Sequence, residues 1–236
     1  MPKREIFVSI DVEADGPIPG QNSMLQLGAA AFDLEADDPR RPVSKFRVNL
    51  EELEGAVQDP GTMEWWSKQG DAYDKTRLNM VKPDYGMEMF ARWLAAVADQ
   101  TKGKLVVAGY PVTYDFMWAY WYFIRFRGFP APFGFQGLDM KTLAMSKLGC
   151  QYRESAKRRF PKTWFEGAPE HTHDAEDDAV GQGVMFVNMV REEGPDPARM
   201  QSALEEIVRL GKCFDAKGTH SERVVRIARK GLGLED

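Results

Sequence analysis

The sequence predicts an α/β protein with a mixed sheet, in which antiparallel hairpin strands are extended by parallel strands and flanked by helices. Three apolar runs follow one another closely within the first 50 residues, and strands connected so tightly pair antiparallel. Two further short apolar runs then alternate with helix-like stretches, which is typical of parallel strands joined through helices. The chain has 236 residues, of which 43% are hydrophobic, and this favours one folded domain with appendages.

The first half of the chain contains the predicted hairpin strands and two helices. Residues 5–11 (EIFVSID) are short, β-branched and apolar, which favours a buried strand, and the turn-forming ADGPIPG ends it. Residues 24–33 and 45–50 predict the second and third strands. Residues 62–69 predict a helix capped by Thr62, and 84–100 predict a longer one. The longer stretch carries apolar residues at helical spacing: Met87, Phe90, Leu94 and Val97.

The second half alternates strands with helices. Residues 105–110 form a continuous apolar run, typical of a strand buried on both faces. Residues 115–126 predict a helix that is apolar nearly all round and therefore central to the core. Residues 137–149 predict a short strand and a helix, 152–169 a long loop without a clean period, and 174–192 a helix.

The resulting order, β-β-β-α-β-α-β-α, is that of a ribonuclease H-like fold. We expect one domain over residues 1–191 and a C-terminal helical extension over 192–236. The extension contains two helix-like stretches, 198–211 and 221–233.

Composition excludes several classes of protein. The net charge of −5 argues against a protein that coats long nucleic acids, although a site gripping a few nucleotides remains compatible. No apolar run approaches the roughly 20 residues of a membrane span, so we expect no membrane association. The chain enters its first strand at once, so no targeting peptide is expected. Cys150 and Cys213 lie far apart without metal-ligand spacing, which favours reduced thiols and a cytoplasmic protein.

The most informative residues are acids in three separate stretches. Asp11 and Glu13 leave the same face of the first strand, because side chains alternate along a strand. Asp115 opens the aromatic helix, and His173 and Asp178 lie at the start of the last core helix. Carboxylates at the ends of apolar runs are costly unless a cation binds them. Four carboxylates and a histidine therefore suggest two divalent cations and phosphodiester hydrolysis.

Each signal alone has a structural alternative. Asp-x-Glu before a glycine is common in strand-end turns. Asp115 can stabilise a helix N-terminus, with Thr113 as the cap, and the acids at 174–178 can do the same. A single histidine before a helix is usually solvated.

In their order along the chain, however, these residues resemble the DEDDh family of 3′→5′ exonucleases. The matching motifs are Asp11-Val12-Glu13, Tyr114-Asp115 and the His-x4-Asp stretch from His173 to Asp178. The resemblance covers about residues 5–190. It implies that the four carboxylates hold two Mg²⁺ ions, with Mn²⁺ as substitute. It also implies that His173 is the general base.

The sequence departs from the family pattern beside the expected substrate terminus. Ala14, Asp15 and Gly16 replace the usual Thr-Gly, and Tyr110-Pro111 replaces His-Asn. These departures put the substrate preference in doubt more than the chemistry. Asp177 competes with Asp178 as a ligand, and the family spacing selects Asp178.

Contacts with the substrate are harder to assign. Trp65, Trp66, Met24 and Leu27 either stack on terminal bases or belong to the core. A basic run interleaved with aromatic residues either contacts phosphates or lies in a solvated loop; it consists of Lys157, Arg158, Arg159 and Lys162.

We therefore expect a metal-dependent 3′→5′ exonuclease that releases nucleoside 5′-monophosphates from single-stranded ends, of DNA or RNA, with a homodimer as a compatible assembly. One alternative is an RNA-specific 3′-end trimming enzyme, and another is a catalytically silent nucleic-acid-binding module. A zinc hydrolase with a histidine-rich site is disfavoured by a total of three histidines.

Overall fold

The sheet of this protein is mixed and has five strands, seen in a computed structural model that describes residues 4–192, 201 and 205. The strand order is β3-β2-β1-β4-β5, with β1 antiparallel to β2 and parallel to β4. β2 and β3 are antiparallel, and β4 and β5 are parallel. The strands are β1 (Glu5–Ala14), β2 (Met24–Phe32), β3 (Ser44–Asn49), β4 (Lys104–Gly109) and β5 (Gly137–Asp139).

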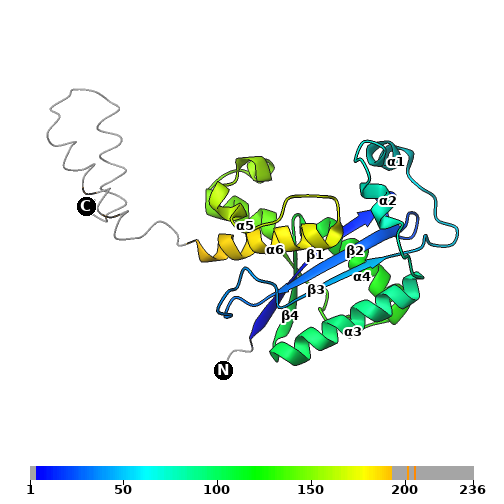
Figure 1. Cartoon of the computed structure of the whole chain (residues 1–236). Coiled ribbons are helices and arrows are strands. Elements are labelled where there is room, and N and C mark those ends of the chain that lie inside the picture. The colour runs from blue at the N-terminus through cyan, green and yellow to red at the C-terminus, as the bar shows by residue number, and fades with distance from the viewer. Residues whose placement is uncertain (1–3, 193–200, 202–204, 206–236) are drawn as a thin grey trace, which may run out of the picture. The chain divides into compact units, whose positions relative to one another are not determined.

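Helices occupy both faces of the sheet (Figure 1). The α-helices are α1 (Pro60–Trp66), α2 (Ala72–Thr76), α3 (Pro83–Thr101), α4 (Val112–Arg127), α5 (Met140–Leu148) and α6 (Ala175–Arg191). Three 3-10 helices fill the segment expected to be a loop: η1 (Tyr152–Glu154), η2 (Lys157–Arg159) and η3 (Lys162–Phe165).

The alternation of β1 side chains explains the two layers. Val8, Ile10 and Val12 join the core cluster that contains α3 and α4. Phe7, on the opposite face, packs against a ring from α6, with the centroids of Phe7 and Phe186 4.8 Å apart. Asp11 and Glu13 share the face of Phe7, so both acids leave the sheet toward α6.

The predicted fold class is confirmed, and the main strands and helices lie where the sequence indicates. The short helix α2 was not predicted, because its five residues are too few to show a period. Two predicted caps were wrong. Asp59, not Thr62, caps α1, and α4 begins at Val112, so Thr113 lies inside the helix. Asp178 falls in the first turn of α6, at the start of the helix as the sequence indicates.

The elements from Glu5 to Arg191 pack as one compact unit. The C-terminal extension predicted over 192–236, with its two helix-like stretches and Cys213, lies almost entirely outside the described residues. Among the helices of the described part of the chain, none has both the length and the apolar character to cross a bilayer.

Candidate active site

The site begins at the end of β1, where two carboxylates project toward α6. Asp11 lies opposite Gly28 of β2, and Glu13 lies opposite Gln26. The parallel pairing of β1 with β4 ends at Ser9. β1 therefore extends beyond its pairing with β4, and both acids lie on this extension. Glu13 is buried at 8% exposure, and Asp11 is partly buried.

The start of α6 lies directly on β2, and a glycine makes this close approach possible. A Cβ atom built on Gly28 would lie 2.0 Å from the backbone of Ala175, closer than real contacts allow. Beside it, the side chain of Gln26 accepts a hydrogen bond from the Ala175 backbone N–H at 2.6 Å. Gln26 is buried, so this bond fixes the first residue of α6 against the sheet.

Fixing the helix in this way brings Asp178 to the two acids of β1. Ligand oxygens of Asp11, Glu13 and Asp178 all lie within 4.8 Å of one another. Asp178 Oδ1 accepts from the Thr172 N–H at 3.2 Å, whereas its buried Oδ2 has no hydrogen-bond partner among the described residues. A buried carboxylate oxygen without a partner is costly, and a cation between the three groups would satisfy it.

Asp115 lies near this trio but is not one of its members. It is in the first turn of α4 and is buried at 5% exposure. Its Oδ1 accepts a hydrogen bond from the backbone N–H of Val12 at 3.2 Å, between the two β1 acids. The structure therefore brings three of the four predicted carboxylates together and holds the fourth against the same strand.

The electrostatics of these groups favour the binding of a cation. Burial and the neighbouring Asp178 raise the pKa of Asp11 to about 7. Burial, followed by the charge of Asp11, raises the pKa of both Glu13 and Asp115 well above their ordinary values. Carboxyl groups that repel one another to this extent ionise together only when a cation lies between them.

Two histidines lie beside the trio. His171 Nδ1 is 2.8 Å from Asp178 Oδ1, and the rings of His171 and His173 are 4.3 Å apart. His173 has a φ of 55°, a conformation uncommon for a residue other than glycine, and its ring meets the edge of Trp65 at 5.1 Å. Burial, followed by the charge of His171, lowers the pKa of His173, which favours the neutral imidazole.

One residue at the site was not predicted. Gln182 donates from Nε2 to Asp11 Oδ1 at 2.6 Å, and it lies one helical turn after Asp178. That spacing of four residues on a helix was a usable signal. Lys157, in η2, lowers the pKa of both Asp11 and Asp115 through its charge and lies over the ring of Tyr110. Lys157 belongs to the basic run that the sequence suggested for phosphate contact, but no local pattern placed its charge beside the carboxylates.

A cavity of about 250 Å³ connects these groups. Its lining includes Lys157, His171, Asp178 and Gln182. It therefore combines a cation, two ligands or bases and an amide beside the carboxylate trio, which suits an anionic ligand bound near a metal.

Three of the residues considered for base stacking belong instead to the core. Met24 and Leu27 are fully buried, and Trp66 is 2% exposed. Trp66 Nε1 also donates to the backbone oxygen of Ala14 at 2.9 Å. The core alternative therefore holds for Met24, Leu27 and Trp66, because a base cannot reach these side chains.

Trp65 differs from its neighbour, since it is 41% exposed and lies against His173. In the turn after β1, Ala14 and Asp15 are buried, and Ser23 donates its N–H to Asp15. The carbonyl oxygen of Gly16, the next residue, accepts from the Tyr114 hydroxyl at 3.3 Å.

Two further predicted substrate contacts lie around η2. Tyr110 is partly buried, and its hydroxyl donates to the Ser155 carbonyl at 2.7 Å. Arg158 is exposed, next to Lys157. Lys157, rather than Arg158, is the member of this basic run whose charge reaches the carboxylates.

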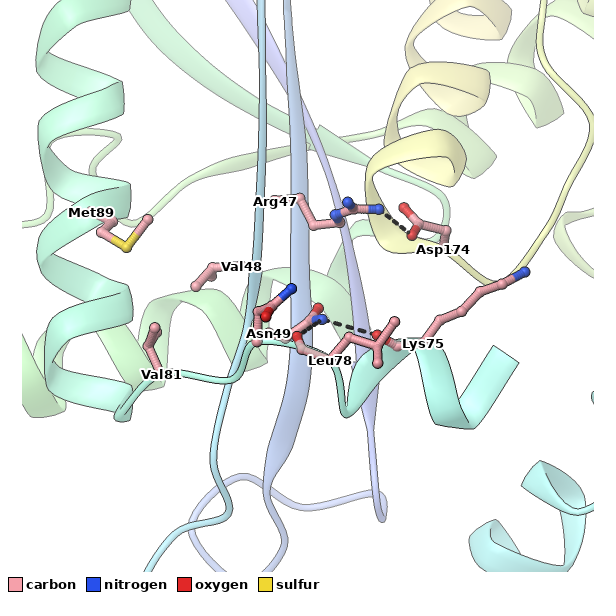
Figure 2. A pocket seen from close by; sticks show the side chains of 9 residues that line it. Arg47, Val48, Asn49, Lys75, Leu78, Val81, Met89 and Asp174 are labelled. Carbon is pink, nitrogen blue, oxygen red and sulfur yellow. Dashed lines mark hydrogen bonds and ion pairs between the residues drawn. The ribbon is translucent and has the colours of Figure 1, made fainter. Parts of the chain in front are cut away.

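A second hollow, of about 310 Å³, lies along the edge strand β3 (Figure 2). None of the four predicted carboxylates lines it. It does contain Asp174, whose carboxylate forms an ion pair with Arg47 at 2.7 Å, as Figure 2 shows. Because Asp174 also receives the N–H of Glu176, this pair helps to fix the start of α6 and hence His173 and Asp178.

Comparison with known proteins gives a consistent picture. The chain is 31% identical over 189 residues to the 3′-5′ DNA exonuclease Cap18 of Escherichia coli, a match covering 78% of this chain and 90% of that protein. No family model matches the chain.

Several solved structures share the fold. The nuclease domain of 3′hExo, a DEDDh family member bound to rAMP, matches with a TM-score of 0.59 and 11% identity over 81% of this chain and 94% of that one. The Mg²⁺- and Mn²⁺-bound form of S. pombe Pop2p matches with a TM-score of 0.56 and 17% identity, over 82% and 86% of the two chains. The zinc-bound complex of E. coli ExoI with single-stranded DNA matches with a TM-score of 0.52 and 16% identity, over 87% and 44%.

Proposed function

This chain belongs to the DEDDh family of 3′→5′ exonucleases, and we propose that it removes nucleotides from the 3′ ends of single-stranded DNA with Mg²⁺ bound at Asp11, Glu13 and Asp178. The observation that carries the proposal is the meeting of these three carboxylates, with ligand oxygens within 4.8 Å of one another. Asp11 and Glu13 lie near the start of the domain's sequence and Asp178 lies near its end. The fold therefore brings them together.

The donor set fits Mg²⁺. It consists of carboxylate oxygens, which this ion prefers, and it includes the buried Oδ2 of Asp178, which has no hydrogen-bond partner in the part of the chain that the structure describes. Asp115, bound to the Val12 N–H, would contribute to a second ion, partly through water. When bound, the two ions would neutralise the scissile phosphate, stabilise the leaving oxygen and lower the pKa of the attacking water.

The protein's own residues supply the remaining steps. His173, whose pKa is lowered by burial, takes the proton of the water that attacks phosphorus. The bond from phosphorus to the 3′-oxygen of the preceding nucleotide breaks, that oxygen takes a proton from solvent to become a 3′-hydroxyl, and a nucleoside 5′-monophosphate leaves. Gln182 holds Asp11 in place through its 2.6 Å hydrogen bond, and Lys157 presents a cation to the phosphate groups.

DNA is favoured as the substrate because the curated relative is named as a DNA exonuclease and is 31% identical over most of its length. Trp65 is the exposed aromatic side chain beside His173, and it would stack on the terminal base. Arg158 and the turn at Gly16 would contact the adjoining backbone.

The test is digestion of 5′-labelled single-stranded DNA and RNA of identical sequence, with Mg²⁺, with Mn²⁺ and with EDTA. We expect a DNA ladder that shortens from the 3′ end with either metal and no cleavage in EDTA. Faster cleavage of RNA would replace DNA by RNA as the substrate. No cleavage of either polymer in Mn²⁺ would overturn the proposal in favour of a binding module.

A further inference from the structure

The two histidines and Asp178 form a second group of ligand atoms, which shares Asp178 with the carboxylate trio. We propose that His171, His173 and Asp178 constitute a second metal site, selective for Zn²⁺-like ions, whose occupation inhibits the enzyme. The inhibition rests on the proposed role of His173, whereas the binding site itself does not.

The distances within this group suit a shared ion. One ligand atom from each of the three residues lies within 4.8 Å of the other two. His171 Nδ1 and Asp178 Oδ1 are already 2.8 Å apart, close to the roughly 3 Å that separates two ligand atoms of one zinc ion. The remaining separation can close by rotation of imidazole rings about their side-chain torsions.

The environment of the group also points to a cation. Asp178 is 5% exposed, and its Oδ2 is buried with no hydrogen-bond partner among the described residues. The His171 side chain is 61% exposed, so an ion can enter from solvent and keep open positions for water. Three protein ligands with an open position are the usual arrangement at non-structural zinc sites.

The chemistry of the ligands separates the two sites. Asp11, Glu13 and Asp178 offer only oxygen, which suits Mg²⁺ and Mn²⁺. Two imidazoles with one carboxylate favour Zn²⁺, because Zn²⁺ binds nitrogen ligands more tightly than Mn²⁺ does. Zn²⁺ should therefore select the histidine group even when Mg²⁺ is in excess.

Occupation of the histidine group would stop catalysis for two reasons. His173 would give its lone pair to the ion and so be unable to accept a proton from water. Asp178 belongs to both groups, so an ion held by the histidines would compete for a ligand of the carboxylate trio.

Binding is tested without any nuclease assay, with Co²⁺ as a spectroscopic substitute for Zn²⁺ and with excess Mg²⁺ present. We expect wild type to develop the visible absorption of Co²⁺ bound by nitrogen ligands, saturating at one equivalent. His171→Ala should weaken this binding at least about tenfold, since one of three ligands is lost. Asp11→Asn, which we expect to be inactive, should retain the signal.

Controls make the result specific to this site. His220→Ala removes the chain's third histidine and should bind Co²⁺ like wild type. Circular dichroism checks that His171→Ala is folded, and His171→Asn provides a second variant at the same exposed position. An unchanged Co²⁺ titration in folded variants at 171 would overturn the site, whether or not the wild-type protein proves to be a nuclease.

Inhibition is tested by adding Zn²⁺ to the Mg²⁺-dependent reaction. We expect low Zn²⁺ to inhibit wild type and His220→Ala, and His171→Ala to require at least about tenfold more. Equal sensitivity of His171→Ala and wild type would show that Zn²⁺ acts at the carboxylates alone and would overturn the inhibitory role.

Discussion

Gln182 donates a hydrogen bond from Nε2 to Oδ1 of Asp11 at 2.6 Å, joining the last helix of the domain to its first strand. The other side-chain atom of this amide, Oε1, is buried without a hydrogen-bond partner among the described residues. Of the two polar atoms of this side chain, only Nε2 therefore has a hydrogen-bond partner among the described residues. That hydrogen bond orients the carboxylate of Asp11 within the trio.

Replacing Gln182 by Met should lower the Mg²⁺-dependent rate by roughly tenfold or more, because a hydrogen bond to a charged group is lost while side-chain volume is kept. The Mg²⁺ concentration for half-maximal rate should rise. Asn188→Ala is the matched control, since this amide on the same helix binds the carbonyls of Trp164 and Glu166 instead. Equal effects in the two variants would indicate a general destabilisation of α6.

Asp11→Asn should lower the exonuclease rate by about 10³-fold or more, because a neutral amide would hold a divalent cation much less tightly than the carboxylate it replaces. The rate on labelled DNA is the measurement, with Asp177→Asn as a neighbouring-acid control. Asp177 is not a member of the carboxylate trio, so Asp177→Asn should be nearly as active as wild type. If Asp11→Asn kept more than about a tenth of the rate, the assignment of Asp11 would be wrong.

The two histidines can be separated by single substitutions assayed in Mg²⁺ with Zn²⁺ excluded. His173→Ala should lose on the order of 10²- to 10⁴-fold in rate, as expected for loss of a general base, with metal affinity largely kept. His171→Ala should stay close to wild type. A larger loss at position 171 would identify His171 as the base, which its 2.8 Å contact with Asp178 makes a direct alternative.

The pH dependence of the rate should follow His173. Burial and His171 lower the pKa of His173 below its ordinary 6.5, and the neutral imidazole is the active form. The rate should therefore rise with pH, reach its midpoint below 6.5 and then level. Initial rates from pH 5 to 9 provide the test at saturating Mg²⁺, with His173→Ala as the comparison. If the rate of His173→Ala depends on pH in the same way as that of wild type, a group other than His173 controls the pH dependence.

Without metal, the protein should become less stable as pH rises. The folded-state pKa of Asp11 is about 7, above the ordinary 3.8, and those of Glu13 and Asp115 are also raised. The folded state therefore binds protons more tightly than the unfolded state, and this stabilisation is lost as pH rises from about 4 through 7. Melting temperatures in EDTA should fall over that range.

Two additions to the same melting experiment identify the cause. Mg²⁺ should restore stability at high pH, because it binds only the folded state. Asp11→Asn should flatten the decline, since one repelling charge is gone. A wild-type melting temperature in EDTA that does not change between pH 4 and 8 would contradict the electrostatic description of the site.

The sequence allowed the sheet and most of the carboxylate positions to be predicted, for identifiable reasons. The alternation of side chains along a strand predicts that Asp11 and Glu13 lie on one face of the sheet. In the structure both carboxylates lie on the face that α6 covers, close to Asp178. Trp65 and Trp66, in contrast, are adjacent in the chain yet exposed to very different degrees, at 41% and 2%. Neither periodicity nor residue type distinguishes two neighbours in a seven-residue helix.

Other features depend on tertiary contacts that no local pattern encodes. Lys157 reaches the carboxylates from a 3-10 turn whose position is set by packing, including the hydrogen bond between Tyr110 and Ser155. The close contact of His171 with Asp178 likewise arises from the path of the loop before α6. The motif spacing selected His173 but gave no indication that a second imidazole would lie 4.3 Å away.

The placement of Asp11 on β1 and Asp178 on α6 has a consequence for synthesis of the protein. A growing polypeptide that has not yet reached residue 171 lacks His171, His173, Asp178 and Gln182. Such a chain can form the hairpin of β1 and β2, but it cannot assemble the carboxylate trio. An incomplete chain therefore lacks the metal-binding group, which forms only after nearly the whole domain has been synthesised.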